Sequence, residues 1–347
     1  MRYKMLGRTG LFVSEMCLGT MTFGENRGPY GAAGWIGEAD ALSIIRRGFD
    51  AGINFVDTAN VYAQGRSEEI VGRAIGTLGL ARHDVVIATK AEHPVGNRPN
   101  DAGATRHHLI HQVQQSLVRL GTDYIDLYQL HGFDPVTPLE ETIRALEDLV
   151  RQGAIRYVGV SNWAAWQVTK ALGIAERLNA SPFCCYQGYY SLAARDLERE
   201  LIPMLASEGA GLMVFSPLAG GFLSGKYRDG TTGRRDVVPF PPVDVDRGAK
   251  VLSAMDSIAA THGVTLAAIA VAWLLQQPVV TSVILGAKSL SQIDDQLAAR
   301  DITLSQDELA TLAQASAPPV EYPGWALASN DAARTTLLRT GHFPTQH

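Results

Sequence analysis

Eight short apolar runs, each followed by a longer segment of helical periodicity, constrain the fold of this 347-residue chain more than any other feature. The runs recur mostly at intervals of ~30–40 residues, which is the size of a βα unit. They are continuously apolar, as parallel strands covered by helices are. The predicted strands are EMCLG (15–19), INFVD (53–57), DVVIATK (84–90), YIDLYQL (124–130), IRYVGVS (155–161), FCCYQ (183–187), GLMVFS (211–216) and TSVILG (281–286).

The segments between these runs carry apolar residues at helical spacing. One predicted helix, SEEIVGRAIGTLG, starts with Ser67 as its N-cap. The other predicted helices are 39–52, 106–121, 138–153, 163–178, 196–208, 289–300 and 246–277, the last divided near Gly263. Eight βα units predict an α/β fold, a (β/α)8 TIM barrel in preference to an open doubly wound sheet.

Three segments lie outside the repeat. RYKMLGRTGLFVS, at the start, predicts a β-hairpin around Arg8-Thr9-Gly10 that plugs the bottom of the barrel. The long segments 23–37 and 225–245 follow strands one and seven, on the face where such barrels carry their active sites. We expect a single barrel domain over 1–317 and a C-terminal tail, 318–347, that lies over or beside the barrel mouth.

Charge and cysteine content exclude several classes of protein. Thirty basic and 35 acidic residues give a net charge of −5, which predicts neither a nucleic-acid nor an anionic-membrane partner. No run reaches the ~18 apolar residues of a membrane helix, and MRYKMLGRTG lacks the apolar core of a signal peptide. Three cysteines form no disulfide framework, so we expect a cytoplasmic protein. Self-association is left open.

Familiar phosphate and metal motifs fit poorly. No G-x-G-x-x-G lies between a predicted strand and a helix. GGFLSGKY (220–227) has the spacing of a phosphate-binding P-loop, but Tyr227 stands where Ser or Thr would hold magnesium. His107 and His111 lie four residues apart without a third ligand, which favours a solvated helix face. We therefore expect no metal.

Four proton-capable side chains lie at the ends of neighbouring predicted strands. Asp57 ends strand two, and Tyr62 follows it in DTANVY. Lys90 ends strand three, and His131 comes directly after strand four. In a barrel these strand ends are neighbours on the catalytic face. Each residue alone could be a cap, a loop aromatic, a solvated strand end or a core histidine, but the set favours catalysis.

The chemistry of the set follows from ordinary pKa values of ~10 for tyrosine and ~10.4 for lysine. A lysine cation beside the phenol favours the phenolate, and an aspartate would keep that lysine charged and oriented. A neighbouring histidine could donate a hydrogen bond to a substrate oxygen. The set therefore predicts a proton donor aimed at a carbonyl oxygen. Because no metal or protein nucleophile accompanies it, hydride from a reduced nicotinamide is the expected nucleophile.

The chain resembles the aldo-keto reductases over nearly all of 1–312. The resemblance is carried by GFDAGINFVDTANVYAQGRSEEIVGRAI, LYQLHGFDPVTPLEETIRALEDLVRQGAIRYVGVSNW and FSPLAGGFLSGKY. The chain is more similar to the bacterial branch that resembles potassium-channel β-subunits than to the aldose-reductase branch. The resemblance implies a (β/α)8 barrel and an Asp-Tyr-Lys-His tetrad, carried here by Asp57, Tyr62, Lys90 and His131.

The resemblance also implies NADPH/NADP+ as cofactor, with NADH possible. Lys288 replaces the family's common arginine, which keeps a charge for a 2′-phosphate but loses the planar fork, and Gln296 replaces a common asparagine. The residues implied as cofactor contacts are Gly19, Thr20, Met21 and Asp57 beneath the cofactor; Ser161, Asn162 and Gln187 at the carboxamide; Phe215 against the nicotinamide ring; Ser216, Pro217, Leu218, Gly220 and Lys226 at the pyrophosphate; and Gly286, Lys288, Gln292, Asp295 and Gln296 at the adenine end.

The resulting hypothesis is an NADPH-dependent oxidoreductase that reduces an aldehyde or ketone to an alcohol, with Tyr62 as proton donor. Two alternatives stay open. A cofactor-binding, redox-sensing regulatory subunit of the channel β-subunit type could keep an intact tetrad. A metal-free barrel isomerase or aldolase would use Lys90 as base or nucleophile, but it leaves Ser161-Asn162 and the motifs of strands seven and eight unexplained.

The small-molecule carbonyl substrate is specified only broadly. An apolar, aromatic-lined entrance would suit aromatic aldehydes, steroid-like ketones or dicarbonyls, and the same residues suit ordinary packing. The candidate substrate residues are Met21, Phe23, Tyr30, Trp35, Tyr62, His131 and Trp163.

Overall fold

The computed structural model describes residues 1–25, 31, 34–228 and 230–327. The chain divides into a compact unit, Met1–Ser316, and a second unit that starts at Ala317. The candidate substrate residue Tyr30 and most of the tail, 328–347, lie outside the described residues. A position of the tail over the barrel mouth therefore stays a prediction.

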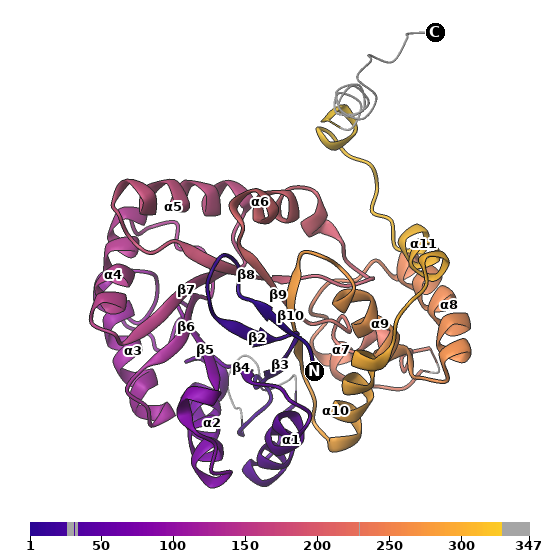
Figure 1. Cartoon of the computed structure of the whole chain (residues 1–347), viewed down its shortest axis with the longest axis horizontal. Helices are drawn as coiled ribbons and strands as arrows, with labels where there is room; N and C mark the ends of the chain where they lie inside the picture. The colour runs from indigo at the N-terminus through magenta and orange to yellow at the C-terminus, as the bar shows by residue number, and fades with distance from the viewer. Residues whose placement is uncertain (26–30, 32–33, 229, 328–347) are drawn as a thin grey trace. The chain divides into compact units, whose positions relative to one another are not determined.

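Eight parallel strands close into a barrel in the order β10-β3-β4-β5-β6-β7-β8-β9 (Figure 1). All eight predicted strands are present, and their ends differ from the predicted ones by at most two residues. The (β/α)8 fold is confirmed. The strands are β3 (Met16–Gly19), β4 (Phe55–Asp57), β5 (Val86–Ala91), β6 (Ile125–Leu130), β7 (Ile155–Ser161), β8 (Phe183–Tyr189), β9 (Gly211–Phe215) and β10 (Val280–Leu285).

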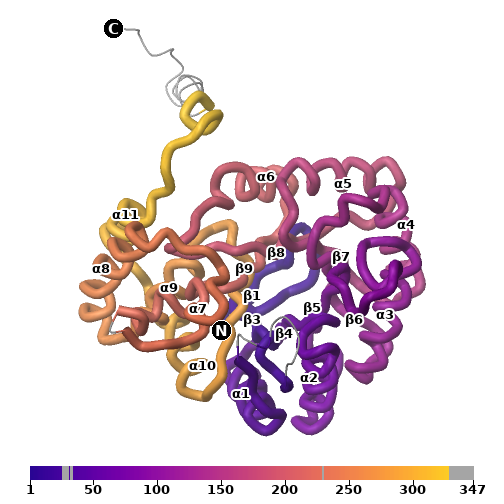
Figure 2. Tube along the Cα trace, turned by 180° about the vertical axis from the view of Figure 1, so that it is seen from behind, coloured from indigo at the N-terminus to yellow at the C-terminus, as the bar shows by residue number. Residues whose placement is uncertain are grey.

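Helices surround the barrel in both views (Figures 1 and 2). The predicted break near Gly263 is confirmed, since this glycine (φ +64°) ends one helix and the Thr265 hydroxyl caps the next. The helices are α1 (Glu38–Asp50), α2 (Arg66–Thr77), α3 (Arg106–Leu120), α4 (Leu139–Arg151), α5 (Ala165–Arg177), α6 (Leu201–Glu208), α7 (Arg234–Val237), α8 (Val245–His262), α9 (Leu266–Leu275), α10 (Leu290–Leu297) and α11 (Gln306–Ala315). Short 3-10 turns are η2 (Tyr62–Gly65), η3 (Arg82–Asp84), η4 (Asp196–Glu198), η5 (Phe222–Ser224) and η6 (Ala298–Asp301).

No single helix within the described ranges has the length and apolarity needed to cross a membrane. One bent pair, α8 with α9, meets the criterion only jointly, across a 95° bend.

The N-terminal hairpin closes one end of the barrel, as predicted. Strands β1 (Tyr3–Met5) and β2 (Phe12–Ser14) pair antiparallel, and they cover the barrel end that faces the reader in Figure 1. Leu6 and Val13 are fully buried in one cluster with inward-facing strand residues such as Phe55. Gly7 has φ +60°, and a Cβ there would lie 2.2 Å from the Cys184 carbonyl oxygen, so only glycine allows the hairpin to seat this deeply.

The predicted N-cap role of Ser67 is wrong. Helix α2 already begins at Arg66, after Gly65 in the left-handed region (φ 91°). The Ser67 hydroxyl instead lies 2.8 Å from both the carbonyl oxygen and the hydroxyl of Thr20. The serine is needed inside the first helical turn because it ties α2 to the carboxyl end of β3.

Candidate active site

Asp57, Tyr62, Lys90 and His131 lie together at the carboxyl ends of β4, β5 and β6. The strand register places Asp57 opposite Ala88, and Lys90 opposite Gln129 on the next strand. Tyr62 opens the turn η2, which leads from β4 into α2. The His131 N–H donates to the Ala91 carbonyl 2.9 Å away, so strand pairing extends as far as this histidine.

Lys90 is the centre of this group, and its side chain is fully buried. Its ammonium donates to Asp57 Oδ2 at 2.5 Å and to the Thr58 carbonyl at 2.9 Å. It also lies 3.4 Å from the Tyr62 hydroxyl. Burial by itself would lower the pKa of Lys90, but the attraction of Asp57 and Tyr62 outweighs it and raises the pKa. The lysine is therefore a cation held against the phenol.

Two glutamines complete the environment of Asp57. Gln129 Nε2 donates to Asp57 Oδ1 at 3.1 Å, and Gln187 Nε2 donates to the same oxygen at 2.8 Å. Gln187 was expected at the carboxamide, and here its amide nitrogen faces the aspartate. Gln129 was missed by the sequence analysis. Its signal was a glutamine next to the last residue of β6, where a buried amide needs a partner.

The turn that carries Tyr62 is strained. Ala63 (φ 48°), Gln64 (φ 56°) and Gly65 (φ 91°) are three successive left-handed residues, and only the last is a glycine. Each non-glycine residue in this region costs about 1–3 kcal/mol, and such strain concentrates at functional sites. The turn leaves Tyr62 8% exposed, with Lys90 Nζ 5.0 Å from its ring centroid.

His131 lies beside Tyr62 with ring centroids 5.7 Å apart in an edge-to-face arrangement. It is 7% exposed, and its Nδ1 has no hydrogen-bond partner among the described residues. Burial, with repulsion by Lys90 and His93, holds the pKa of His131 well below its usual value. The imidazole is therefore neutral at neutral pH and can donate a hydrogen bond without carrying a charge.

This depressed pKa predicts that acid destabilises the fold through His131. The unfolded chain takes up a proton near the ordinary histidine pKa of about 6.5, whereas folded His131 does not. The free energy of unfolding should therefore fall as the pH drops from about 6.5 to 5. His131→Gln should show a smaller fall, measured by urea unfolding at both pH values.

The exposed His107 provides a matched control for this measurement. In His107→Gln, the free energy of unfolding should fall with pH as much as it does in the wild type. If the free energy of unfolding falls equally in the wild type and in His131→Gln, His131 is not the cause of the acid destabilisation. His108, whose pKa burial also lowers, accounts for a remaining fall in the variant.

The residues expected at the nicotinamide end lie around the same strand ends. Asn162 (φ 60°) donates from Nδ2 to the His131 carbonyl at 3.1 Å and to Ser161 Oγ at 3.0 Å. Thr20 donates from both its N–H and its hydroxyl to the Asp57 carbonyl, so it supports the aspartate. Phe215 stacks on Tyr189, with ring centroids 5.9 Å apart.

The segment expected at the pyrophosphate is a tight turn after β9. Ser216 (φ 54°) and Ala219 (φ 50°) are left-handed, and Ser216 Oγ accepts from the Gly220 N–H at 3.2 Å. Pro217 is buried and Leu218 half-buried. Lys226 Nζ lies 4.9 Å from the centroid of the Tyr227 ring.

The residues expected at the adenine end lie just before α10 and along it. Gln292 Oε1 accepts from the Lys288 N–H at 2.8 Å. Gln296 Nε2 donates to the carbonyls of Gly286 and Gln292, both at 3.0 Å. A Cβ on Gly34 would lie 2.8 Å from Lys288 Nζ, so the loop after β3 reaches this lysine. Asp295 is half-buried.

Two buried polar atoms near these segments have no hydrogen-bond partner in the described part of the chain: Arg234 Nε and Gln296 Oε1. Burial lowers the pKa of Arg234, and Tyr227 and Tyr62 both act on it electrostatically. An unpaired buried guanidinium nitrogen suits an anionic ligand. Sequence reasoning missed Arg234, although the Arg-Arg pair in the loop after strand seven was a signal.

The aromatic residues proposed for the entrance fall into two groups. Phe23 is fully buried, and Trp163 is 2% exposed between Phe133 and Phe183, so both pack in the core. Trp35 is 49% exposed, and Met21 is half-buried.

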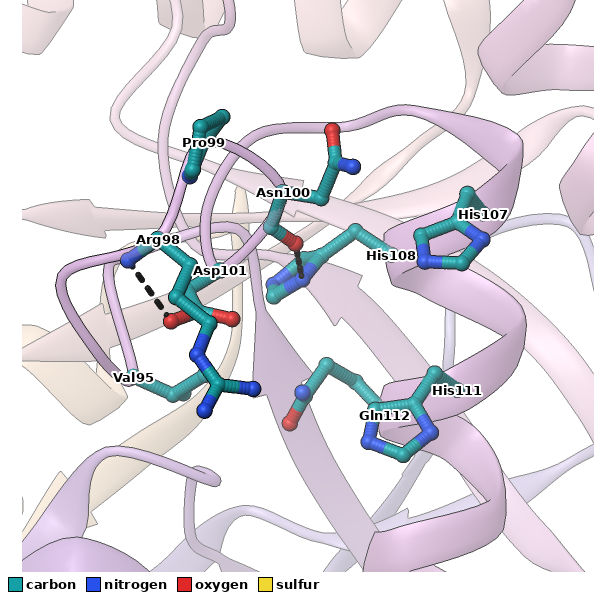
Figure 3. A pocket seen from close by; sticks show the side chains of 9 residues that line it. All are labelled: Val95, Arg98, Pro99, Asn100, Asp101, His107, His108, His111 and Gln112. Carbon is teal, nitrogen blue, oxygen red and sulfur yellow. Dashed lines mark hydrogen bonds between the residues drawn. The ribbon is translucent and has the colours of Figure 1, made fainter.

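A cavity of about 590 Å³ lies beside α3 and is lined by none of the four tetrad residues (Figure 3). His107, His108 and His111 line it, and His108 Nδ1 lies 3.0 Å from the Asn100 carbonyl. Gln112 on its wall accepts a hydrogen bond at 2.9 Å from Asn60, which lies two residues before Tyr62. Over the described ranges, no group of three or more His, Cys, Asp or Glu residues could hold a metal ion.

Comparisons with known proteins agree with this geometry. The model of the aldo/keto reductase family matches residues 15–317. The chain is 40% identical to a probable voltage-gated potassium channel subunit beta of Arabidopsis thaliana, covering 87% of this chain and 92% of that protein. It is 36% identical to an uncharacterized oxidoreductase of Bacillus subtilis, covering 90% of this chain and 95% of that protein. It is 33% identical to the versiconal hemiacetal acetate reductase of Aspergillus parasiticus, covering 93% of this chain and 99% of that protein. With its barrel and the match over 15–317, the chain belongs to the aldo/keto reductase family.

Proposed function

We propose that this oxidoreductase reduces an aldehyde or ketone to an alcohol with NADPH, and that Tyr62 donates the proton. The observation that carries the proposal is the buried Lys90 cation, which contacts the Asp57 carboxylate and the Tyr62 hydroxyl at once. A charged lysine in this position stabilises the phenolate that remains after proton transfer. His131, neutral beside Tyr62, can donate a hydrogen bond to the same carbonyl oxygen.

The reduced nicotinamide, when bound, supplies the hydride that the carbonyl carbon gains. Tyr62 transfers its proton to the carbonyl oxygen, and the hydrogen bond from His131 stabilises the negative charge that develops there. The Lys90 cation, itself bound by Asp57, stabilises the resulting phenolate until solvent returns the proton. Asn162 donates a hydrogen bond to the backbone carbonyl of His131 and so helps to fix the position of this histidine.

The residues present fit a dinucleotide phosphate. Unpaired buried atoms of Arg234 and Gln296 offer a donor and an acceptor without a partner in the described chain. Ser216, Gly220 and Lys226 would hold the pyrophosphate, and Lys288 with Gln292 and Gln296 would hold the adenosine. Gly19, Met21, Ser161 and Asn162 would lie along the nicotinamide half.

Lys288 should discriminate NADPH from NADH. Charge-assisted hydrogen bonds are worth ~1.5–3 kcal/mol, so Lys288→Ala should weaken NADPH binding by about 10–150-fold. NADH binding should stay nearly unchanged, as measured by quenching of protein fluorescence. Equal losses for both cofactors would instead assign Lys288 a role in the loop that Gln292 caps.

A panel of aldehydes and ketones with NADPH, and with NADH alongside, tests the proposed function. We expect continuous NADPH oxidation with formation of one alcohol per NADPH. Failure of the whole panel, in a protein that binds NADPH, would favour the second candidate function.

That second candidate is a cofactor-binding regulatory subunit, favoured by the similarity to the Arabidopsis thaliana protein named a channel subunit beta. Such a subunit would bind NADPH with little or no turnover. Multiple turnovers with a simple aldehyde therefore separate the two functions. The aldolase alternative is weakened by Lys90 itself, because its ammonium is already bound to Asp57 and its raised pKa disfavours the neutral amine.

A further inference from the structure

His93 stacks on the face of His131, with ring centroids 4.2 Å apart and ring planes inclined by 19°. The His93 side chain is 34% exposed, whereas residue His131 is 7% exposed overall. His93 therefore lies on the open side of the buried histidine. An oxygen atom bound by His131 would have the His93 ring as a neighbour.

Glu92 fixes which nitrogen of His93 is available. Glu92 Oε2 lies 2.7 Å from His93 Nδ1, and because a carboxylate only accepts, the hydrogen is on Nδ1. In the neutral ring, Nε2 is then a hydrogen-bond acceptor. His93 Nε2 makes no hydrogen bond to any residue in the described part of the chain.

The backbone around Glu92 is shaped to hold this pair. Glu92 has φ 125°, a conformation that residues with a Cβ rarely adopt, and its carbonyl accepts from the Gly103 N–H at 2.8 Å. Its Oε2 lies 2.7 Å from the position that a Cβ on Gly132 would occupy. The glycine directly after His131 thus leaves room for the carboxylate. Backbone strain of this kind at a site points to function.

We propose that His93 is a specificity-determining residue that accepts a hydrogen bond from a hydroxyl group on the carbon next to the substrate's carbonyl. The stacked rings offer hydrogen-bonding atoms to two oxygens on adjacent carbons: His131 donates to the carbonyl and His93 accepts from the hydroxyl. The substrates are then α-hydroxy aldehydes or α-hydroxy ketones, and the products are vicinal diols. This inference rests on the proposed reductase function.

Acetophenone and 2-hydroxyacetophenone, which differ only in that hydroxyl, provide the test. With NADPH, the wild-type kcat/KM should be roughly 10-fold higher or more for the hydroxy ketone. His93→Phe keeps a flat ring against His131 but lacks the acceptor, so the ratio should fall by roughly 10-fold, to the intrinsic reactivity ratio of the two ketones. Glu92→Gln, which still accepts from Nδ1–H, should keep most of the ratio. His107→Phe, on the exposed face of α3, should keep all of it.

His93→Leu, which loses the stack as well, should also lose the ratio, so the test survives poor folding of the phenylalanine variant. The inference is overturned if His93→Phe keeps the wild-type ratio, whether its kcat/KM is unchanged on both ketones or falls equally on both. The latter result would assign His93 a supporting role under His131. If the wild-type protein reduces none of the carbonyl compounds tested, benzaldehyde included, the proposed function is refuted, and the inference with it.

Discussion

Replacing Tyr62 with phenylalanine should slow hydride transfer by roughly 10²–10⁴-fold, the usual contribution of a positioned general acid. The ring would still pack against His131, and Lys90 would keep its bonds to Asp57 and Thr58. Fold and NADPH affinity should therefore be preserved, and the loss should lie in the chemical step. Single-turnover NADPH oxidation in a stopped-flow instrument measures that step directly.

The matched control is Tyr227→Phe, because this hydroxyl lies in the loop after β9 and bonds the Gly220 carbonyl at 3.4 Å. Its rate of hydride transfer should stay within a few-fold of wild type. If Tyr62→Phe transfers hydride at the wild-type rate, the proton comes from another donor.

Breaking the buried Asp57–Lys90 pair should reduce both stability and activity. Removing one partner of a buried ion pair leaves an unpaired charge and costs about 3–5 kcal/mol. Among the described residues, Lys90→Met leaves the Asp57 carboxylate with two side-chain donors, Gln129 and Gln187. Asp57→Asn leaves a buried ammonium without its counter-ion. Urea unfolding should show a loss of this size in each variant.

A double-mutant cycle decides whether the pair acts as a unit. Its nitrogen and oxygen are 2.5 Å apart, so the loss in Asp57→Asn/Lys90→Met should be clearly smaller than the sum of the single losses. Strict additivity of the unfolding free energies would mean that the two charges stabilise the fold independently, contrary to this geometry.

The fold was predictable because the strands are mostly apolar runs and the helices between them carry apolar residues at helical spacing. The tetrad was predictable as well, since Asp57, Lys90 and His131 end neighbouring strands, and barrel topology brings such ends together. The predicted start of a helix was wrong where a polar side chain bonds a distant segment instead of capping the helix. Ser67 resembles an N-cap in sequence, but its hydroxyl bonds Thr20 across 47 residues.

Contacts between distant segments were out of reach for the sequence. Gln129, Gln187 and Asp57 meet through hydrogen bonds that span 72 and 130 residues. Trp163 looks like an entrance aromatic in sequence, yet it packs between Phe133 and Phe183. From sequence alone, an aromatic loop residue that packs in the core looks the same as one that contacts a substrate, because both roles bury apolar surface.

The pH dependence of single-turnover hydride transfer tests the central claim, that the Lys90 cation tunes Tyr62 as the proton donor, most directly. In wild type the rate should fall at alkaline pH as the phenol loses its proton. Lys90→Met removes the cation that lies 3.4 Å from the Tyr62 hydroxyl and favours the phenolate. The phenol therefore keeps its proton to a higher pH in this variant. The account predicts that the alkaline limb of the Lys90→Met profile moves to higher pH. An alkaline limb at the same pH in both proteins would contradict it.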